Sequence, residues 1–305
     1  MRYVTVLAVW ALVLAGCGGI ETGDTSTTLP GTTTTPSTTT TLPSTTTPAP
    51  STTSTSLMEK TGLVVYLVLD QLPDETGGPY IVPVYREAPV SGDLPSTVME
   101  ALLAGPTSDE STGTPGVSTA IPAGTTLLGV QVDSGLATVD LSAEYDDGGG
   151  SAAMFARLAQ VVYTLTRLPD IDQVAFSING EPVMIFSSEG IELDGPQARD
   201  DYYEQIPPIF VDSPAWGEPV TSPLTVSGLS NVFEAVSQVM LTDDDGAPLY
   251  EGTVMATCGT GCWGQWETEV EYEIDRPQFG ALIVWEFSAK DGSRVNVREY
   301  PVLLN

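Results

Sequence analysis

The sequence predicts an α+β domain followed by an all-β domain, both preceded by a long unstructured segment. Three observations lead to this prediction. Thr, Ser and Pro dominate residues 17–58. Apolar stretches with strand and helix periodicity alternate over residues 59–186. Short alternating stretches separated by turn dipeptides fill residues 207–305, a pattern typical of a β-sandwich. An acidic stretch at 187–206 is predicted to be a linker between the two domains, and its alternative is that Tyr202, Tyr203 and Ile206 pack on one of them.

Residues 1–16 have the organisation of a signal peptide. Arg2 precedes an apolar stretch that glycine interrupts before the roughly 20 residues needed to span a membrane. The Leu-Ala-Gly-Cys sequence ending at Cys17 resembles the bacterial lipobox, which implies cleavage after Gly16 and lipidation of Cys17, with palmitate as a label for the acyl chains. The alternative is an ordinary secretory signal with an unrelated cysteine. We expect a protein anchored by lipid on the extracytoplasmic face of the cell membrane.

Composition limits both the structure of the N-terminal segment and the class of partner. Residues 17–58 are too poor in apolar side chains to form a core, which predicts a disordered stalk. The chain has 10 Lys and Arg against 40 Asp and Glu, a formal net charge of −30. Nucleic acid and anionic lipid surfaces are excluded as partners because binding them relies on basic side chains. The simplest interpretation of the charge is solubility.

The α+β domain is expected to begin with two strands, at residues 63–69 and 80–85. A helix follows, with a predicted start at Thr97, because Thr97 and Glu100 have capping-box spacing, and an end at Gly105-Pro106. The later elements are a hairpin over 127–141 that turns at Asp133-Ser134-Gly135, a helix whose apolar stripe is Met154, Leu158, Val161 and Leu165, and strands at 174–178 and 183–186.

Four short segments of this domain resemble a known family. They are ALLAGP at 101–106, IPAGT at 121–125, ATVDLS at 137–142 and VYTL at 162–165. Their order and spacing are similar to those of the GerMN domain of sporulation and spore germination proteins. The resemblance covers residues 61–186. It implies a compact domain used for assembly or interaction in the cell envelope, with no catalytic residues to transfer.

The second domain is predicted from its turns. Asp245-Gly246 and Asp291-Gly292 each lie between alternating runs, which predicts two hairpins. Ile283, Trp285 and Phe287 share one strand face, which we expect to be the core face. Segments 213–214, 222–228, 233–234 and 290–293 resemble the immunoglobulin-like domain that follows GerMN in bacterial spore germination proteins. That resemblance implies a sandwich fold and no particular activity.

The remaining two cysteines, Cys258 and Cys262, are predicted to form a disulfide that staples a loop, because an even pair in an exported chain is typical of one. Two free thiols or half of a metal site are the alternatives. Trp263 and Trp266 lie beside this pair. They are candidates for contact with a sugar or a partner protein, and the alternative is that both pack on their own loop.

The residue inventory argues against most catalytic chemistry. The chain has no histidine, which excludes the Ser-His-Asp and Cys-His sites and the commonest zinc sites. Acidic pairs such as Asp146-Asp147 are more typical of solvated turns than of a glycosidase site. Residues 243–246, Asp-Asp-Asp-Gly, fit a hairpin turn better than a calcium site, because they lack the alternating ligands of an EF-hand. We predict no catalytic residues, no metal and no cofactor.

These observations favour a non-catalytic lipoprotein that acts as a binding or assembly module for envelope proteins or cell-wall polymer. Two alternatives stay open at this level. One is a carboxylate-dependent hydrolase of cell-wall glycan. The other is an accessory sensor subunit of a membrane kinase or transporter.

Overall fold

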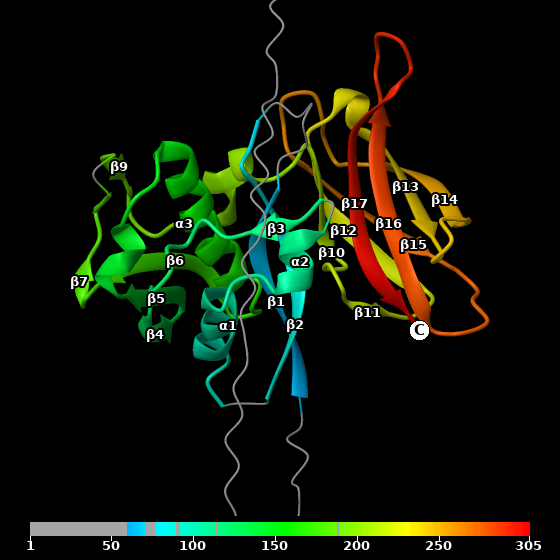
Figure 1. Cartoon of the computed structure of the whole chain (residues 1–305). Coiled ribbons are helices and arrows are strands. Elements are labelled where there is room, and N and C mark those ends of the chain that lie inside the picture. Colours follow the sequence, from blue (N-terminus) through cyan, green and yellow to red (C-terminus); the bar gives the residue numbers. More distant parts are fainter. Residues whose placement is uncertain (1–59, 71–76, 90–91, 114, 188) are drawn as a thin grey trace, which may run out of the picture. The chain divides into compact units, whose positions relative to one another are not determined.

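The computed structural model describes residues 60–70, 77–89, 92–113, 115–187 and 189–305. All of these residues belong to one compact unit (Figure 1). The signal peptide, Cys17 and the stalk lie outside the described residues. Within the described part, none of the helices combines the length and the apolar composition that crossing a membrane requires.

The first domain contains two principal sheets. Strands β1 and β2 pair antiparallel along their whole length, because both are rich in apolar and β-branched residues, and β3 adds to the other edge of β1. The second sheet has the order β4-β5-β6-β7. Its β4-β5 hairpin is confirmed, and β6 contains the strand predicted at 174–178. The strand predicted at 183–186 is confirmed only at 185–186, which lie outside this sheet. The bounds are β1 Lys60–Leu69, β2 Tyr80–Pro89, β3 Val117–Ser118, β4 Leu127–Asp133, β5 Gly135–Leu141, β6 Ile171–Ile178 and β7 Glu181–Pro182.

Helix α3 (Ser151–Leu165) connects the parallel strands β5 and β6 and packs against β1. Its predicted apolar stripe is confirmed, because Met154, Leu158, Val161 and Leu165 are all buried. Polar side chains of the same helix are also buried. The Gln160 side chain donates to the Tyr66 carbonyl at 2.9 Å and accepts from the Ala120 amide at 2.8 Å. These bonds fix the helix to β1.

The first helix, α1 (Leu94–Leu103), begins earlier than the sequence predicts. Its N-cap is Asp93, whose carboxylate accepts from the Ser96 amide, and a proline occupies the first turn. The predicted start at Thr97 is therefore wrong, because Thr97 already lies inside the first turn and its hydroxyl donates to the Asp93 carbonyl. The short helix α2 (Ser108–Thr112) has a complete capping box between Thr107 and Glu110.

The acidic segment 187–206 differs from the spacer that its composition predicts. It contains β9 (Ile191–Glu192), which pairs with β8 (Ile185–Phe186), and the 3-10 helix η2 (Arg199–Gln205). Leu193, Tyr202 and Ile206 are buried, and η2 packs against α3. The acidic side chains surround apolar residues that dock on the first domain, as the alternative expects, so residues 189–206 are part of the fold.

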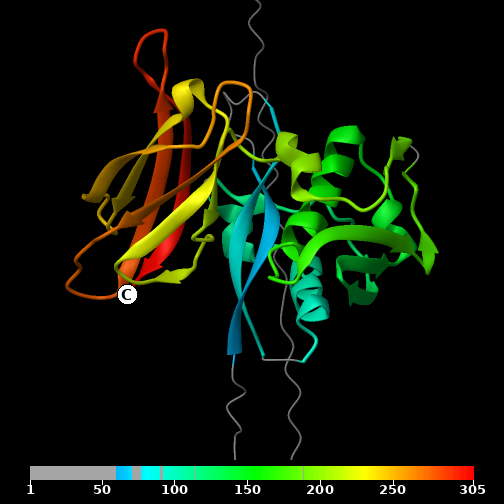
Figure 2. The same cartoon turned by 180° about the vertical axis from the view of Figure 1, so that it is seen from behind.

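The second domain is a two-sheet sandwich (Figure 2). One sheet has the order β10-β12-β15 and the other the order β11-β17-β16-β13-β14. The turns at Asp245-Gly246 and Asp291-Gly292 join β13 to β14 and β16 to β17, as the dipeptides predict. The bounds are β10 Ile209–Ser213, β11 Pro219–Val220, β12 Leu224–Ser230, β13 Val236–Thr242, β14 Pro248–Met255, β15 Gly264–Val270, β16 Gln278–Phe287 and β17 Arg294–Leu304.

The face of β16 that packs in the core is the opposite of the one expected. Leu282 and Val284 are fully buried, whereas Ile283 is half-buried and Phe287 is 51% exposed. Trp285 is fully buried, as expected. The prediction that Ile283, Trp285 and Phe287 together form the core face is therefore wrong for Ile283 and Phe287. Apolar side chains occur on both faces of this strand, so alternation alone does not distinguish inside from outside.

Candidate functional site

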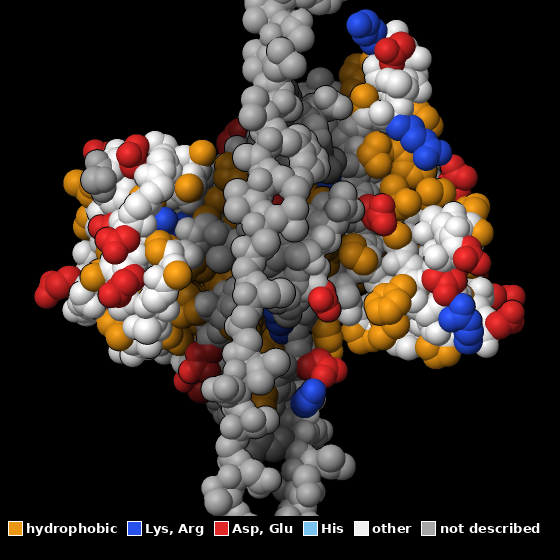
Figure 3. Space-filling model, viewed as in Figure 1, with side chains coloured by type: hydrophobic (Ala, Val, Ile, Leu, Met, Phe, Trp, Pro, Cys, Tyr) orange, Lys and Arg blue, Asp and Glu red, His pale blue; other side chains and the backbone are white. Residues whose placement is uncertain are grey.

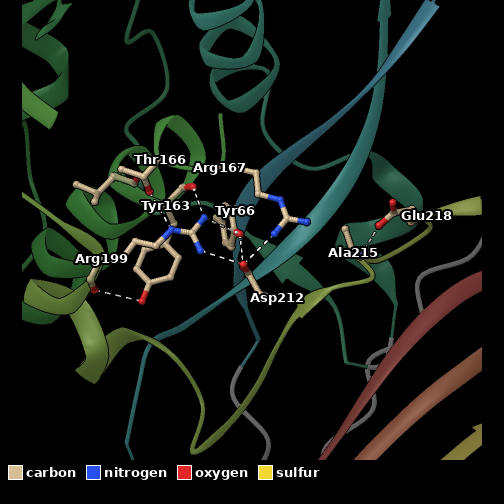
Figure 4. A network of polar contacts seen from close by, with 9 residues as sticks. Tyr66, Tyr163, Thr166, Arg167, Arg199, Asp212, Ala215 and Glu218 are labelled. Carbon is tan, nitrogen blue, oxygen red and sulfur yellow. Dashed lines mark hydrogen bonds and ion pairs between the residues drawn. The ribbon is translucent and has the colours of Figure 1, made fainter. Parts of the chain in front are cut away.

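Asp212, at the start of the second domain, lies in a network of polar contacts with side chains of the first domain (Figure 4). Its carboxylate accepts from Arg167 at 2.8 Å, from Arg199 at 3.0 Å and from the hydroxyl of Tyr66. These donors come from three places: Tyr66 from β1, Arg167 from the turn after α3, and Arg199 from η2. The single carboxylate therefore joins the two domains.

Arg199 is held on every side of its guanidinium. Nε donates to Thr166 Oγ1 at 2.9 Å, and Nη2 donates to the Tyr163 carbonyl and the Tyr66 hydroxyl, each at 3.2 Å. The guanidinium also lies over the Tyr163 ring, 4.7 Å from the ring centroid. Its side chain is 25% exposed. Lysine could not form all of these hydrogen bonds, because it has one ammonium group in place of the planar guanidinium.

The electrostatics of the network keep Asp212 ionised. Burial by itself raises the pKa of Asp212, but the charges of Arg199 and Arg167 and the Tyr66 hydrogen bond outweigh burial and hold that pKa below its usual value. The pKa of the Tyr66 hydroxyl is raised, chiefly by its burial. The carboxylate therefore acts as a charged hydrogen-bond acceptor and is unsuited to act as a general acid.

A second contact extends the joint between the domains. The Trp216 carbonyl accepts from the Tyr85 amide, and the Trp216 amide donates to the Pro83 carbonyl, both at 2.9 Å. This bridge adds Trp216 to the outer edge of β2. The nearby Glu218 side chain accepts from the Ala215 amide at 2.7 Å, which holds the segment in place (Figure 4). The second domain thus covers the open edge of β2 at Val84, which forms an isolated bridge with Trp216.

A groove with a volume of about 640 Å³ lies beside this network. Its floor is the outer face of β12 and β15, where Leu229 is paired with Gln265 and Ser227 with Glu267. Arg199 and Tyr203 of the first domain's η2 line one part, and β14 with the residues after it lines another. The full lining is Arg199, Tyr203, Phe210, Asp212, Ser227, Gly228, Leu229, Met255, Thr257, Gln265, Trp266 and Glu267.

The groove brings together side chains of mixed character. Met255 is 73% exposed, and the remainder is lined by hydroxyls, an amide, aromatic and aliphatic side chains, the guanidinium of Arg199 and the carboxylates of Asp212 and Glu267. Gly228 permits close packing on the floor, because a Cβ there would collide with the Phe210 carbonyl and approach Trp266 to 3.1 Å. Concave surfaces at domain junctions with apolar and a few polar groups are the usual form of a binding site.

The predicted ligand-contact tryptophans have different positions. Trp266 lines the groove but is only 4% exposed, so its ring is mainly a packing element. Trp263 is half-buried and its ring lies 5.3 Å from that of Tyr203. The structure pairs Cys258 with Cys262 as a disulfide, with Cα atoms 6.0 Å apart. The pair lies in the loop before β15, so it staples the loop next to the groove.

The other candidate sites of the sequence have ordinary structural roles. Asp243 accepts from the amides of Asp245 and Ala247, and Asp244 pairs with Arg276 at 2.7 Å. This is a capped hairpin turn. Among the described residues, no group of three or more Cys, Asp or Glu side chains is arranged to hold a metal ion.

Sequence reasoning missed the central residues of the site. Arg199 and Asp212 lie in segments that look like acidic linker and strand start, and their partners are distant, with Tyr66 146 residues away from Asp212. One signal was available. Arg199 is the single basic residue in the acidic stretch 187–206. A lone basic residue in such a stretch suggests an ion pair with a buried carboxylate.

The fold and the joint define a two-domain module in which an α+β domain carries an immunoglobulin-like sandwich. Residues 64–184 match the family described as sporulation and spore germination, and residues 208–293 match the immunoglobulin-like domain of bacterial spore germination. The chain therefore contains a GerMN domain followed by the immunoglobulin-like domain of spore germination proteins. At this level it is an envelope-associated module, and neither family description names an enzymatic activity.

Individual relatives and solved structures match only part of this chain. A curated relative, lipoprotein LpqB of Thermobifida fusca (strain YX), is 32% identical over 134 residues, which are 43% of this chain and 20% of the relative. The chain thus spans about a fifth of that relative's length. The tandem GerMN domains of the sporulation protein GerM from Bacillus subtilis align with a TM-score of 0.39 at 24% identity, covering 49% of this chain and 48% of that one. The first GerMN domain alone aligns with a TM-score of 0.35 at 22% identity, covering 46% and 99%.

Proposed function

We propose that the chain is a lipid-anchored, non-catalytic binding module whose groove holds an extended segment of another envelope protein. The observation that carries the proposal is the open groove, which is lined by side chains of both domains and has Met255 at its margin. The lipobox at Cys17 and the relative named as a lipoprotein support anchoring on the extracytoplasmic face of the cell membrane.

The carboxylates of the groove favour binding over hydrolysis. A hydrolase that uses two carboxyl groups needs one whose pKa is raised so that it stays protonated and can donate. Asp212 has a lowered pKa and is engaged by two arginines. The described carboxyl groups with a clearly shifted pKa are all shifted downward; they are Glu110, Glu144, Asp212 and Asp291.

The lining of the groove favours a polypeptide over a wall polymer. Sugar recognition relies on open aromatic faces, whereas Trp266 is buried and Trp263 packs on Tyr203. Anionic polymers are disfavoured by the excess of 40 acidic over 10 basic residues. A flexible, exposed methionine beside hydroxyl and amide groups is typical of surfaces that accommodate peptide segments.

Site-specific photo-crosslinking in intact cells tests the proposal. A photoreactive amino acid replaces Gln265, whose side chain lines the groove, in the full-length chain. The matched control replaces Glu269, which lies on the same face of β15 and is exposed, but does not line the groove. We expect a crosslinked protein from position 265 that is absent from position 269, with the crosslink mapping to one continuous segment. Equal capture at both positions, or capture of glycan alone, would reject a peptide groove.

Anchoring is tested separately. Metabolic labelling with palmitate should mark the wild-type chain and leave Cys17→Ser unlabelled. If wild type stays unlabelled and fractionates away from the membrane, the lipid anchor is wrong whatever the groove binds. The identity of a crosslinked protein also decides whether the chain is a sensor subunit, since that function requires a membrane kinase or transporter as the captured partner.

A further inference from the structure

A small pocket lies on the first domain, separate from the groove at the joint. It has a volume of about 190 Å³ and is bounded by α3, by β9 with the residues that follow it, and by η2. We call it the α3 pocket. All of its lining residues except Phe155 come from the acidic stretch 187–206, which packs against α3. The stretch that the sequence predicts to be a linker therefore builds a concave surface.

The walls of the α3 pocket are largely apolar. Leu193 and Tyr202 are buried, and Ile191 is half-buried. Phe155, on α3, is 37% exposed, although the solvent side of a helix normally carries polar side chains. The Tyr202 hydroxyl donates to the Gln197 side chain at 2.8 Å, which fixes the orientation of the ring. An aromatic face is thus left open beside a fixed apolar wall.

Three carboxylates line the same pocket, those of Glu192, Asp194 and Asp201. All three residues are exposed, and none belongs to an ion pair within the described part of the chain. The arginines of α3 and η2 are engaged elsewhere, because Arg157 donates to three carbonyls and Arg199 to Asp212. Figure 3 shows acidic and hydrophobic side chains interspersed around β7 and β9, with little basic surface among them. The residues that the structure describes therefore leave the charge of the α3 pocket without a counter-charge.

The size and the charge of the pocket restrict its ligand. Pockets for drug-sized molecules have volumes of about 300–1,000 Å³, so a volume of about 190 Å³ suits a single side chain. A metal ion needs several closely spaced ligands, and the described residues contain no such group of three or more. Anions are repelled by the carboxylates. A long cationic side chain matches both parts, because its aliphatic stem covers the apolar walls while its charged end meets the carboxylates.

We propose that the α3 pocket binds an arginine side chain of a partner protein. A guanidinium is planar, presents its donors in a fork that matches a carboxylate, and stacks on aromatic faces. Phe155 supplies an open aromatic face, and Glu192 and Asp194 supply the carboxylates. A lysine ammonium could pair with a carboxylate but lacks the planar contact with the ring. The chain itself has 10 basic against 40 acidic residues, so a different protein is the better source of the arginine.

The α3 pocket and the groove share η2 but none of their lining residues. Arg199 and Tyr203 line the groove, whereas Asp201 and Tyr202 line the α3 pocket. All of the lining of the α3 pocket belongs to the first domain and its ordered acidic segment. Arginine binding here therefore does not depend on the groove being occupied, and each of the two proposals can fail while the other holds.

Fluorine NMR of the full-length chain tests the proposal. 4-Fluorophenylalanine replaces Phe155, and the chain is titrated at constant ionic strength with N-acetylarginine amide. The matched probe is N-acetylcitrulline amide, because citrulline has the same length and a planar end but no charge. We expect the arginine probe to shift the fluorine signal to saturation and the citrulline probe to bind about two- to thirtyfold more weakly, the effect of two exposed ion pairs. N-acetyllysine amide should also bind more weakly than the arginine probe.

Neutral substitutions at the pocket provide a second test. Glu192→Gln with Asp194→Asn removes two carboxylates of the pocket, whereas Asp200→Asn with Glu204→Gln removes two exposed carboxylates of the same stretch that do not line it. Asp201 stays unchanged, because its side chain also accepts from a backbone amide at the start of η2. The first double variant should bind the arginine probe no better than the citrulline probe, and the second should bind it as wild type does.

Several results would overturn the proposal. These are the absence of a saturating shift with the arginine probe, equal affinities for the arginine and citrulline probes, and equal losses in the two double variants. Equal affinities for the arginine and lysine probes would reject recognition of the guanidinium. An unchanged urea midpoint verifies that each variant is folded, and the comparison of probes on the chain with its native carboxylates decides the outcome independently of the variants.

Discussion

Replacing Asp212 with alanine should both destabilise the protein and uncouple its two domains. The substitution removes the acceptor shared by Arg167, Arg199 and Tyr66. Arg199 and Arg167 are 25% and 28% exposed, so water can solvate them only in part after the carboxylate is lost. The Tyr66 side chain is fully buried and would lose one partner of its hydroxyl.

The expected magnitude follows from these exposures. Removing one partner of a fully buried ion pair costs about 3–5 kcal/mol, whereas an exposed pair contributes about 0–1 kcal/mol. Asp212 is 22% exposed, which places the network towards the buried limit after allowance for partial solvation. We therefore expect a loss of about 3 kcal/mol in the free energy of unfolding, which is more than a hundredfold in the folded-to-unfolded ratio.

Two signals in one urea titration separate destabilisation from uncoupling. Trp216, Trp263, Trp266 and Trp285 are all in the second domain, so fluorescence reports on the sandwich, while circular dichroism at 222 nm reports mainly on the helices of the first domain. In wild type the two transitions should coincide, and in Asp212→Ala they should separate. Asp244→Ala, which breaks the exposed pair with Arg276, is the control. If both variants lost less than about 1 kcal/mol and kept coincident transitions, the network would not be the joint.

Three further predictions concern the same fold. Because the pKa of Asp212 is lowered in the folded state, its stabilisation is present above about pH 3.9 and is lost as the pH falls through its folded pKa; the difference in urea midpoint between wild type and Asp212→Asn should therefore shrink from about pH 5 to pH 2.5, and a constant difference contradicts this. Arg157→Lys should lower the unfolding free energy by about 2–4 kcal/mol in thermal unfolding, because one guanidinium donates to three carbonyls, and a loss below about 1 kcal/mol would show that lysine suffices. Gly228→Ala should cost at least about 1–3 kcal/mol through collision with the Phe210 carbonyl, whereas Gly129→Ala, with open space around its Cα, should be nearly neutral; equal urea midpoints would contradict the close packing.

Most helices and strands of the first domain could be predicted, because each depends on residues that are close together in the chain. The α3 stripe and the β4-β5 hairpin each depend on residues close in the chain, and both are confirmed. The start of α1 was predicted wrongly for a local reason as well. Thr97 and Glu100 have the spacing of a capping box, but the N-cap is Asp93. The face of β16 was assigned wrongly because both of its faces are apolar, so the period of two contains no information about which side meets the second sheet.

The candidate site was beyond sequence reasoning for a different reason. Its bonds join positions such as Tyr66 and Arg199, which are 133 residues apart, and no periodicity encodes such a pair. The large number of acidic residues also made Asp212 hard to recognise as a site residue. In a chain with 40 acidic residues, Asp212 looks like any other, and only the arginines around it distinguish it.

The shape of the groove depends on the joint between the domains. The groove is lined by residues of both domains, with Tyr203 from one and Gln265 from the other, and it lies beside the Asp212 network. Asp212→Ala should therefore reduce photo-crosslinking from position 265. Asp244→Ala, which breaks an exposed ion pair outside the groove lining, should leave that crosslink unchanged. A crosslink of equal yield in both variants would show that the groove keeps its shape without the network.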